Sequence, residues 1–229
     1  MPNRPTVVAV LPAYNLERLI PEIVARTRPF VDHVVVTADA SRDGTAAAAR
    51  AAGADVPEPE NVRGKGYALI KGIARAKELG AGIVVMLDSD GQHLPEEIPV
   101  LLAPLLEGRA DLVSGSRMLG TLRTRAINKF GNHVLRMQSF LLTGRWLTDT
   151  ETGFRAFTAE TIFRMPLTAR GYEIESEIMM RALHAKVRIV EVPIHVPFAV
   201  KGATAWDGLR VAWYKLKLAL ALKTGIVKA

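Results

Sequence analysis

Residues 83–93 read Ile83-Val84-Val85-Met86-Leu87-Asp88-Ser89-Asp90-Gly91-Gln92-His93, an apolar run that leads directly into two carboxylates. The apolar part predicts a buried strand, and Gly91 marks its end. Asp88 and Asp90 are two residues apart, so both face one point once the chain leaves the strand. With the amide oxygen of Gln92 they form a ligand set suited to Mg²⁺ or Mn²⁺. Taken alone, a solvated acidic turn is the simpler interpretation.

Strands alternate with helices over the first 115 residues, a pattern that predicts an α/β protein with a mostly parallel, doubly wound sheet. In such sheets ligands bind beyond the carboxyl ends of the strands. Asn15, Asp39 and Asp88 each follow a predicted strand and are expected to share that edge. Strands are expected at 6–11, 31–37, 83–87, 111–114 and 187–196, helices at 16–28, 45–52, 66–79, 95–107, 123–143, 171–184 and from 206 onward, and a loop or short strand at 149–157.

Composition narrows the classes of function. The chain has 229 residues, no cysteine and a net charge of +7. The absence of cysteine excludes disulfides and thiolate chemistry, while the positive charge favours anionic partners. No nucleic-acid partner is expected, because aromatic residues are only 6% of the chain and no basic run is interleaved with them. The amino terminus lacks the order of a signal peptide and no apolar run approaches 18 residues, so we expect a cytoplasmic protein, peripheral on the cytoplasmic face of the membrane.

Two further acidic and glycine-rich segments have simpler interpretations. Gly64-Lys65-Gly66 opens a predicted helix, where backbone N–H groups favour a phosphate, although a structural glycine turn is equally compatible with the sequence. The cluster Glu173, Glu175 and Glu177 is expected to be a solvated helix start, favoured there by the helix dipole, and a role at the sugar is the alternative.

The motifs taken together resemble those of the family 2 glycosyltransferases. Leu11-Pro12-Ala13-Tyr14-Asn15 is similar to their opening motif, residues 38–45 to their D-D-x-S-x-D-G-T, and Asp88-Ser89-Asp90 to their metal-binding D-x-D. Ser114-Gly115-Ser116-Arg117 and residues 149–155 resemble the polyprenyl-phosphate (dolichol-phosphate) mannose synthase group. The resemblance implies a GT-A type nucleotide-sugar-binding fold, with a mostly parallel central sheet flanked by helices and amphipathic helices in the carboxyl-terminal half.

The resemblance also implies roles for individual residues. Asp88, Asp90 and Gln92 would hold the metal, and Asp88, Asp90 and Arg117 would be catalytic. Arg117 and Arg125 would bind the acceptor phosphate, with Arg123 as a substitute for Arg125. The donor-binding residues would be Pro12, Tyr14, Asn15, Glu17, Asp39, Lys65, Asp88, Ser89 and Asp90.

Three departures from the family pattern affect the donor. Leu16 stands where the family has glutamate, with Glu17 after it, and Ala38 replaces the first aspartate of the D-D pair. Near the carboxyl terminus, residues 202–205 replace a segment with arginine and Ser-Lys, and Lys201 is the nearby cation. These residues therefore do not select GDP-mannose over UDP-glucose or UDP-N-acetylglucosamine.

The acceptor decides which residues the reaction needs. A lipid phosphate is already an anion and needs no general base, whereas a hydroxyl acceptor needs a group to take its proton. Asp149, Glu151 and His93 are the candidates for that base. In-line displacement would invert the anomeric centre.

Two basic amphipathic segments suggest contact with a membrane surface. In the last helix, Leu209, Ala212, Trp213, Leu216 and Leu220 form one apolar stripe, and Val211, Leu218 and Leu222 form a second on the opposite side. One stripe would pack on the protein and the other would enter the lipid interface, with Arg210, Lys215 and Lys217 reaching headgroups. A dimer helix or a doubly packed terminal helix is the alternative. The segment 123–143 repeats the pattern with Ile127, Phe130, Val134, Phe140, Leu141, Arg123, Arg125, Lys129 and Arg136.

The resemblance divides the chain into a nucleotide-sugar-binding half (1–115), an acceptor-binding half of the same domain (116–200) and a terminal amphipathic helix (201–229). It implies a metal-dependent inverting glycosyltransferase that moves a hexose from a nucleotide sugar to a polyprenyl or dolichyl phosphate. A separate membrane-anchoring subunit is a further partner to consider. Two alternatives stay open: a glycosyltransferase with a soluble hydroxyl or phosphorylated acceptor, and a non-catalytic nucleotide-sugar-binding subunit.

Overall fold

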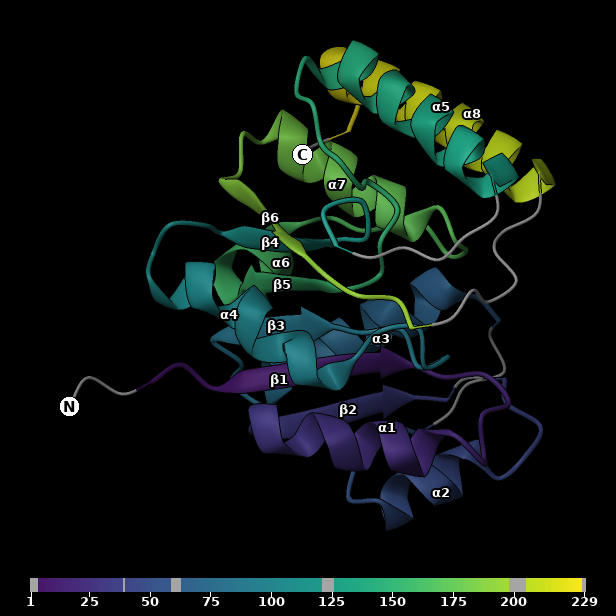
Figure 1. Ribbon diagram of the computed structural model, residues 1–229, viewed down its shortest axis with the longest axis vertical. Coiled ribbons are helices and arrows are strands. Elements are labelled where there is room, and N and C mark those ends of the chain that lie inside the picture. Colours follow the sequence, from purple (N-terminus) through teal and green to yellow (C-terminus); the bar gives the residue numbers. More distant parts are fainter. Residues whose placement is uncertain (1–3, 39, 59–62, 121–125, 198–204, 228–229) are drawn as a thin grey trace.

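A six-stranded sheet in the order β2-β1-β3-β5-β4-β6 forms the centre of the molecule (Figure 1). The computed structural model describes residues 4–38, 40–58, 63–120, 126–197 and 205–227, with the side chains of 126–132 and 205–207 left out. All neighbouring strands are parallel except that β5 runs antiparallel to both β3 and β4. The strands are β1 (Val7–Pro12), β2 (His33–Thr37), β3 (Ile83–Met86), β4 (Leu112–Ser116), β5 (Arg155–Thr158) and β6 (Ile189–Pro193).

Helices cover both faces of this sheet, and the predicted mostly parallel α/β fold is confirmed. They are α1 (Ile20–Thr27), α2 (Thr45–Ala51), α3 (Lys65–Glu78), α4 (Ile98–Leu106), α5 (Ala126–Thr143), α6 (Ala159–Arg164), α7 (Ile174–His184) and α8 (Ala205–Lys223).

The apolar strands are buried on both faces because successive side chains point to opposite sides of a strand. In β1, Val7, Ala9 and Leu11 pack in the core beneath α1, α2 and α4. Val8 and Val10 pack in the second core, beneath α3, α6 and α7. The central strands therefore read as continuous hydrophobic runs, and the sheet is held between two layers of helices.

Helix α3 lies unusually close to its neighbours. A Cβ atom on Gly72 would come within 2.3 Å of the Val10 side chain, and one on Gly66 within 2.2 Å of the Ala169 carbonyl oxygen. The two glycines therefore let the helix backbone approach both the sheet and the segment that leads into α7.

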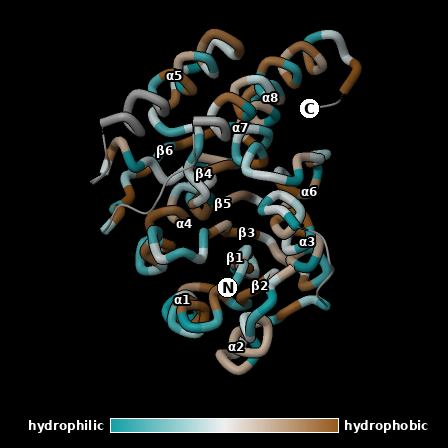
Figure 2. Tube along the Cα trace, turned by 90° about the vertical axis from the view of Figure 1, so that its right-hand side faces the viewer, coloured by the Kyte–Doolittle hydropathy of each residue, from teal (hydrophilic) through white to brown (hydrophobic). Residues whose placement is uncertain are grey.

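Helices α5 and α8 lie side by side and pack on α7, outside the two layers that cover the sheet (Figures 1 and 2). Their shared core with α7 consists of Met180, Leu218, Ala219 and Leu222. Within the described part of the chain, no helix is both long enough and apolar enough to cross a bilayer.

Several details differ from the sequence-based expectations. The first helix begins at Ile20 rather than at residue 16, because residues 15–17 are bonded to the loop that follows β2. Helix α6 was not expected. Glu175 and Glu177, expected to be solvated, are 4% and 0% exposed because buried arginines neutralise them. The division of the chain at residues 115 and 200 stays a prediction.

Two helical glycines offer a matched test of this packing. Gly66→Ala should lower the free energy of unfolding by about 1–3 kcal/mol, because the new methyl group meets a backbone oxygen that cannot turn away. Gly208→Ala, where a Cβ meets nothing within 4 Å, should raise it by about 0.5–1 kcal/mol. Urea unfolding of both variants checks this, and equal effects would contradict the close approach of α3.

Candidate active site

The two carboxylates of the acidic motif lie just past β3, at the edge where β1 and β2 also end. The side chain of Asp88 is 23% exposed, and its carboxylate forms an ion pair with Lys65, whose Nζ is 2.6 Å from Oδ1. Lys65 is the first residue of α3 and also contacts Glu175, with Nζ 2.9 Å from Oε1. Burial opposes the charge of Asp88, but the ammonium of Lys65 outweighs it and lowers the pKa of that carboxyl. Asp88 is therefore ionised and faces the ammonium of Lys65.

Glu175 extends this ion pair into the interior. Its second oxygen, Oε2, is 3.1 Å from Nη1 of Arg155, which is fully buried in β5. Nη2 of Arg155 donates to the carbonyl of Thr150 at 2.8 Å. Asp88, Lys65, Glu175 and Arg155 thus form one alternating chain of charges, in which each buried charge has a partner of opposite sign.

The loop 149–155 presses directly on the acidic motif. A Cβ atom on Gly153 would lie 2.3 Å from Oδ2 of Asp88 and 2.6 Å from its Cγ. Gly153 is therefore the residue that allows this loop to pass beside the carboxylate.

Asp90 lies beside Gln92, whose backbone N–H donates to Oδ1 of Asp90 at 3.0 Å and whose side-chain amide donates to Oδ2. Both residues are partly exposed. In the described ranges, no three or more His, Cys, Asp or Glu side chains are arranged to hold a metal ion. Asp88, Asp90 and Gln92 nevertheless suit Mg²⁺ or Mn²⁺, because such ions are commonly held by one or two carboxylates and completed by substrate phosphates.

Arg117 lies close to the acidic motif, directly after β4, and is paired with Asp149. Its Nε is 2.6 Å from Oδ2 and its Nη2 is 2.8 Å from Oδ1, a two-pronged contact, and the backbone N–H of Arg117 donates to Oδ2 at 3.2 Å. Burial opposes both charges, but their attraction raises the pKa of Arg117 and lowers the pKa of Asp149. Asp149 is itself placed by Glu191 of β6, which accepts its backbone N–H at 3.0 Å.

His93 is buried against the ring of Phe154, with the ring centroids 5.2 Å apart. Its Nδ1 accepts the backbone N–H of Asp88 at 3.4 Å. Burial lowers the pKa of His93, so the imidazole is neutral near pH 7. The side chain therefore packs against Phe154 and holds the backbone of Asp88 by a hydrogen bond.

The predicted donor residues near β1 shape the loop that follows β2. Asn15, in the left-handed region at φ 54°, accepts the backbone N–H of Arg42 through Oδ1 at 2.9 Å. Glu17 accepts the backbone N–H of Gly44 at 3.2 Å. Pro12 ends β1, and Tyr14 is 48% exposed with Arg63 above its ring. The structure therefore brings these residues to one edge, with Asn15 and Glu17 bonded to backbone.

Two further predicted donor residues are placed by the structure. Ser89 is 2% exposed, and its hydroxyl has no hydrogen-bond partner within the described chain. Lys65 follows Gly64, whose φ of 140° and contact with the Arg170 carbonyl exclude a side chain. The carbonyl of Arg170 also accepts the N–H of Tyr67, so the first turn of α3 is partly capped by protein.

Asp39, Arg123, Arg125 and residues 201–204 lie outside the described residues. Their predicted contributions to the donor and acceptor sites stay predictions.

Comparison with known proteins decides the family. The model of Glycosyl transferase family 2 matches residues 8–169, which span every element from β1 to α6. The chain belongs to this family. It is therefore a glycosyltransferase, and the predicted GT-A type fold is confirmed by its structural neighbours.

Relatives of this glycosyltransferase cover almost its whole length. It is 30% identical to the UDP-N-acetylglucosamine–dolichyl-phosphate N-acetylglucosaminyltransferase of Methanococcus voltae, with 95% of this chain and 96% of that protein covered. It is 32% identical to the polyprenol monophosphomannose synthase of Mycolicibacterium smegmatis, with 93% and 87% covered. A similar solved structure is glucosyl-3-phosphoglycerate synthase from Mycobacterium tuberculosis in complex with Mn²⁺, UDP-glucose and phosphoglyceric acid (TM-score 0.76, 25% identity, 98% of this chain and 82% of that chain covered).

Sequence reasoning missed the residues of the glycosyltransferase that hold the motif in place. Glu175 and Arg155 both lie in segments that the sequence singled out, but neither segment predicts their contact, because they meet only through the packing of α7 on β5. Gly153 lay inside the recognised segment 149–155, and its contact with Asp88 was not foreseen. The available clue was the cluster of Glu173, Glu175 and Glu177 in a helix that is otherwise largely apolar.

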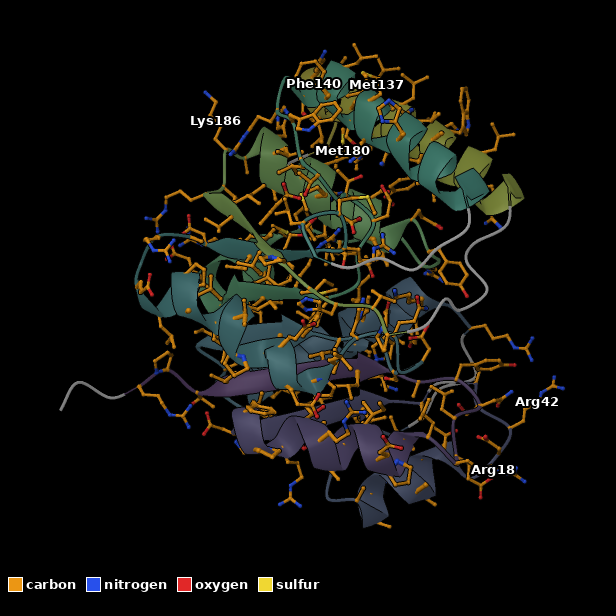
Figure 3. The ribbon with its side chains drawn as sticks, viewed as in Figure 1. Arg18, Arg42, Met137, Phe140, Met180 and Lys186 are labelled. Carbon is orange, nitrogen blue, oxygen red and sulfur yellow. The ribbon has the colours of Figure 1, made fainter. Side chains whose placement is uncertain are left out.

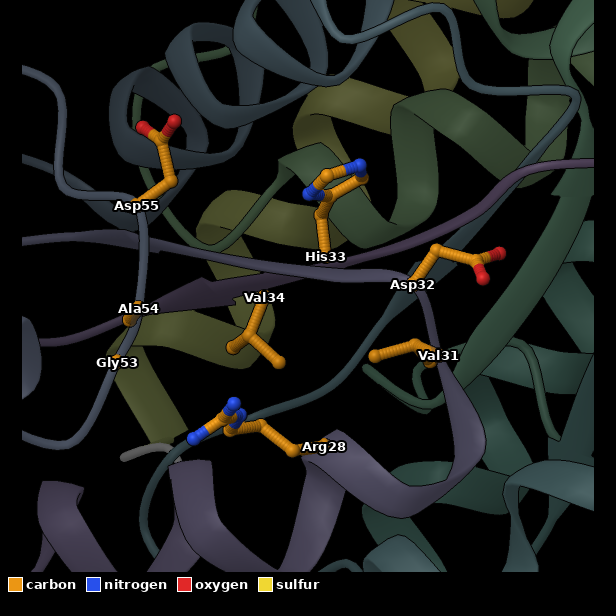
Figure 4. Close-up of a pocket in the computed structure, with 8 residues that line it drawn as sticks. All are labelled: Arg28, Val31, Asp32, His33, Val34, Gly53, Ala54 and Asp55. Atoms are coloured by element: carbon orange, nitrogen blue, oxygen red, sulfur yellow. The ribbon is translucent and has the colours of Figure 1, made fainter.

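A hollow of about 370 Å³ lies away from this site (Figure 4). It is lined by Asp32, His33 and Val34 at the start of β2, together with Arg28 and residues 53–55. Because β1, β2 and β3 are parallel, the start of β2 lies at the amino-terminal ends of these strands, whereas Asp88 lies at their carboxyl-terminal ends. The hollow is not part of the active site.

Gly153→Ala tests the contact between the loop and the acidic motif. The added methyl group should push the Asp88 carboxylate aside and weaken Mn²⁺-dependent nucleotide binding by at least about tenfold, a 1.4 kcal/mol change. The melting temperature should fall by less than in Gly66→Ala, because here a short side chain moves rather than backbone. Isothermal titration and thermal melting measure the two effects. Unchanged nucleotide affinity would show that the carboxylate of Asp88 beside Gly153 takes no part in Mn²⁺-dependent nucleotide binding.

Proposed function

We propose that this enzyme transfers a hexose from a nucleotide sugar to a polyprenyl or dolichyl phosphate, with inversion at the anomeric carbon. The reaction takes place at the cytoplasmic surface of a membrane, where anionic lipids attract a chain of net charge +7. Two relatives that span the same length are named for polyprenyl-type phosphate acceptors, one for N-acetylglucosamine and one for mannose.

The observation that carries this proposal is that all three candidate general bases are already engaged. Asp149 is paired with Arg117, Glu151 is paired with Lys215 of α8, and Nδ1 of His93 accepts a backbone N–H. A hydroxyl acceptor needs a base for its proton, whereas a phosphate monoester attacks as an anion. The site therefore favours a phosphate as nucleophile over a hydroxyl.

Each charged group has a role in that displacement. Asp88, Asp90 and Gln92 would hold a divalent cation, which would supply Lewis-acid stabilisation of the leaving group when bound. Lys65 adds a positive charge beside Asp88 and suits a donor phosphate. Arg117 has five N–H donors, of which Asp149 engages Nε and one on Nη2, so its guanidinium retains capacity for an acceptor phosphate.

The outer face of the α5 and α8 pair supports the membrane as a partner. On α8, Val211, Leu218 and Leu222 are buried against the protein, while Leu209, Trp213, Leu216 and Leu220 of the other predicted stripe are exposed and Ala212 is half-buried. Figure 3 places Met137 and Phe140 on α5 at the same end of the molecule, with Met180 beneath them. Among the described side chains of α5, α8 and the loop after α5, the exposed large apolar ones are Val134, Met137, Phe140, Leu141, Trp146, Leu209, Trp213, Leu216 and Leu220.

The cations of α8 divide between two roles. Arg210 and Lys217 are exposed and suit lipid headgroups. Lys215, also predicted to reach headgroups, is 1% exposed and points into the protein, so that prediction was wrong. A membrane-anchoring subunit is the other partner that would cover the same apolar face.

One observation favours a second candidate acceptor. The similar structure of glucosyl-3-phosphoglycerate synthase contains phosphoglyceric acid, a small phosphorylated molecule. A soluble phosphorylated acceptor is therefore the alternative.

A donor and acceptor panel tests the proposed function. The chain is incubated with GDP-mannose, UDP-glucose or UDP-N-acetylglucosamine, Mn²⁺ or Mg²⁺, and either a polyprenyl phosphate or phosphoglyceric acid. We expect one donor to give an EDTA-sensitive, β-linked lipid product, and Asp90→Asn to lower its rate by at least about a hundredfold, since a metal ligand is lost. A product formed only from the soluble acceptor would support the alternative, and donor binding without transfer would support a non-catalytic subunit.

The membrane contact has its own matched control. Trp213→Ser with Leu220→Ser should lower binding to vesicles containing anionic lipid by at least about tenfold. Each substitution removes an apolar side chain whose burial in the membrane would contribute roughly 1.5–3 kcal/mol to the binding free energy. Val100→Ser with Leu106→Ser removes two apolar residues of similar exposure from α4 and should leave vesicle binding unchanged. Co-sedimentation measures both. Equal binding of the two double variants would move the contact to a protein partner or another face.

A further inference from the structure

Lys215 is the most deeply buried cation of α8 whose side chain is described. Its side chain joins α8 to α5 and to the loop between α5 and β5. It is 1% exposed, and its Nζ donates to Oγ of Ser139 at 3.1 Å and lies 3.4 Å from the carbonyl of Leu135, both on α5. Its charge is neutralised by Oε1 of Glu151, in the loop between α5 and β5. A lysine in this position costs desolvation that only a bonded counter-charge offsets.

Glu151 receives bonds from several sides. Its Oε2 accepts the hydroxyl of Ser176, on α7, at 2.7 Å, and its Oε1 accepts the hydroxyl of Thr150 at 2.9 Å. With Lys215 from α8, the carboxylate is therefore fixed by helices on both sides of the loop. The position of Glu151 depends on how α8 is seated.

The same loop carries the partner of Arg117. The backbone N–H of Glu151 donates to Oδ1 of Asp149 at 3.2 Å, and the same Asp149 oxygen accepts Nη2 of Arg117. A shift of Glu151 thus moves Asp149, and a shift of Asp149 turns the guanidinium of Arg117. Two bonded contacts separate the lysine of α8 from the pair that orients this arginine.

We propose that Lys215 is a positioning residue: through Glu151 it ties the seating of α8 to the Asp149–Arg117 pair, and so sets the geometry of acceptor binding. The inference rests on the proposed function for the role of Arg117, but its structural part does not. Because the opposite side of α8 bears the exposed Trp213 and Leu220, the ion pair links the membrane-facing helix to the reaction site.

Hydrogen exchange of residues 148–153 tests the structural part without any substrate. Lys215→Met keeps most of the side-chain volume and removes the ion-pair partner of the half-buried Glu151. We expect exchange in this segment to accelerate by at least about tenfold. Lys217→Met, two residues away on the exposed side of α8, should leave exchange in 148–153 unchanged. Equal exchange in wild type and Lys215→Met would overturn the inference.

Activity then tests the positioning role. In Lys215→Met, kcat for lipid-phosphate transfer should fall by at least about tenfold, and by a larger factor than the KM for the nucleotide sugar rises, because Lys215 is bonded through Glu151 to the Asp149–Arg117 side of the loop. Adding Glu151→Gln should restore part of both losses, since it removes the unpaired charge. Additive losses, or a rise in donor KM alone, would contradict the role.

The remaining outcomes are also decisive. If Lys215→Met does not fold but the double variant does, the coupling of the two charges is shown directly. Failure of both to fold would assign Lys215 to helix packing alone and overturn the inference. If wild type makes no lipid-linked sugar while Lys215→Met still loosens 148–153, the proposed function fails and the link between α8 and the loop stands.

Discussion

The ammonium of Lys65, held between the carboxylates of Asp88 and Glu175, is the interaction on which the active site depends. It joins the first turn of α3 to the end of β3 and to α7, three elements that are far apart in the sequence. Without that cation, two acidic groups with little solvent would face each other, a costly arrangement. The glycines on either side of Lys65 also help to place its ammonium, because they let the start of α3 lie against residues 169 and 170.

From this centre the charges alternate outward in two directions. Glu175 leads to Arg155 and the carbonyl of Thr150, which holds the loop beside Asp88. Arg117 leads through Asp149 to the backbone of Glu151, whose carboxylate meets Lys215 of α8. The carboxylate of Asp88, the guanidinium of Arg117 and the pair of helices α5 and α8 are therefore parts of one electrostatic network. Such a network places charges before substrate arrives, which is how electrostatic stabilisation of a leaving group is achieved.

The sequence predicted the sheet and the common location of Asn15 and Asp88 just past the ends of β1 and β3, because strand runs and their following turns are local features. It did not predict that β5 runs antiparallel, nor that Glu175 and Glu177 are buried, because both depend on packing between distant segments. Lys215 shows the same limit: its place in a basic amphipathic helix suggested lipid headgroups, yet helical phase alone does not say which cation faces the protein. The apolar stripes of α8 were distinguished correctly, since burial follows a 3.6-residue period.

A structure of this enzyme with Mn²⁺ and a nucleoside diphosphate would show whether Lys65 and Asp88 organise the donor site. We expect the metal within about 2.0–2.3 Å of a carboxylate oxygen of Asp88 or Asp90 and of the diphosphate. Lys65 should then remain on Glu175 while its ammonium turns from Asp88 toward the phosphates. A metal and nucleotide bound at another edge of the sheet, with the Lys65–Asp88 pair intact, would contradict this expectation.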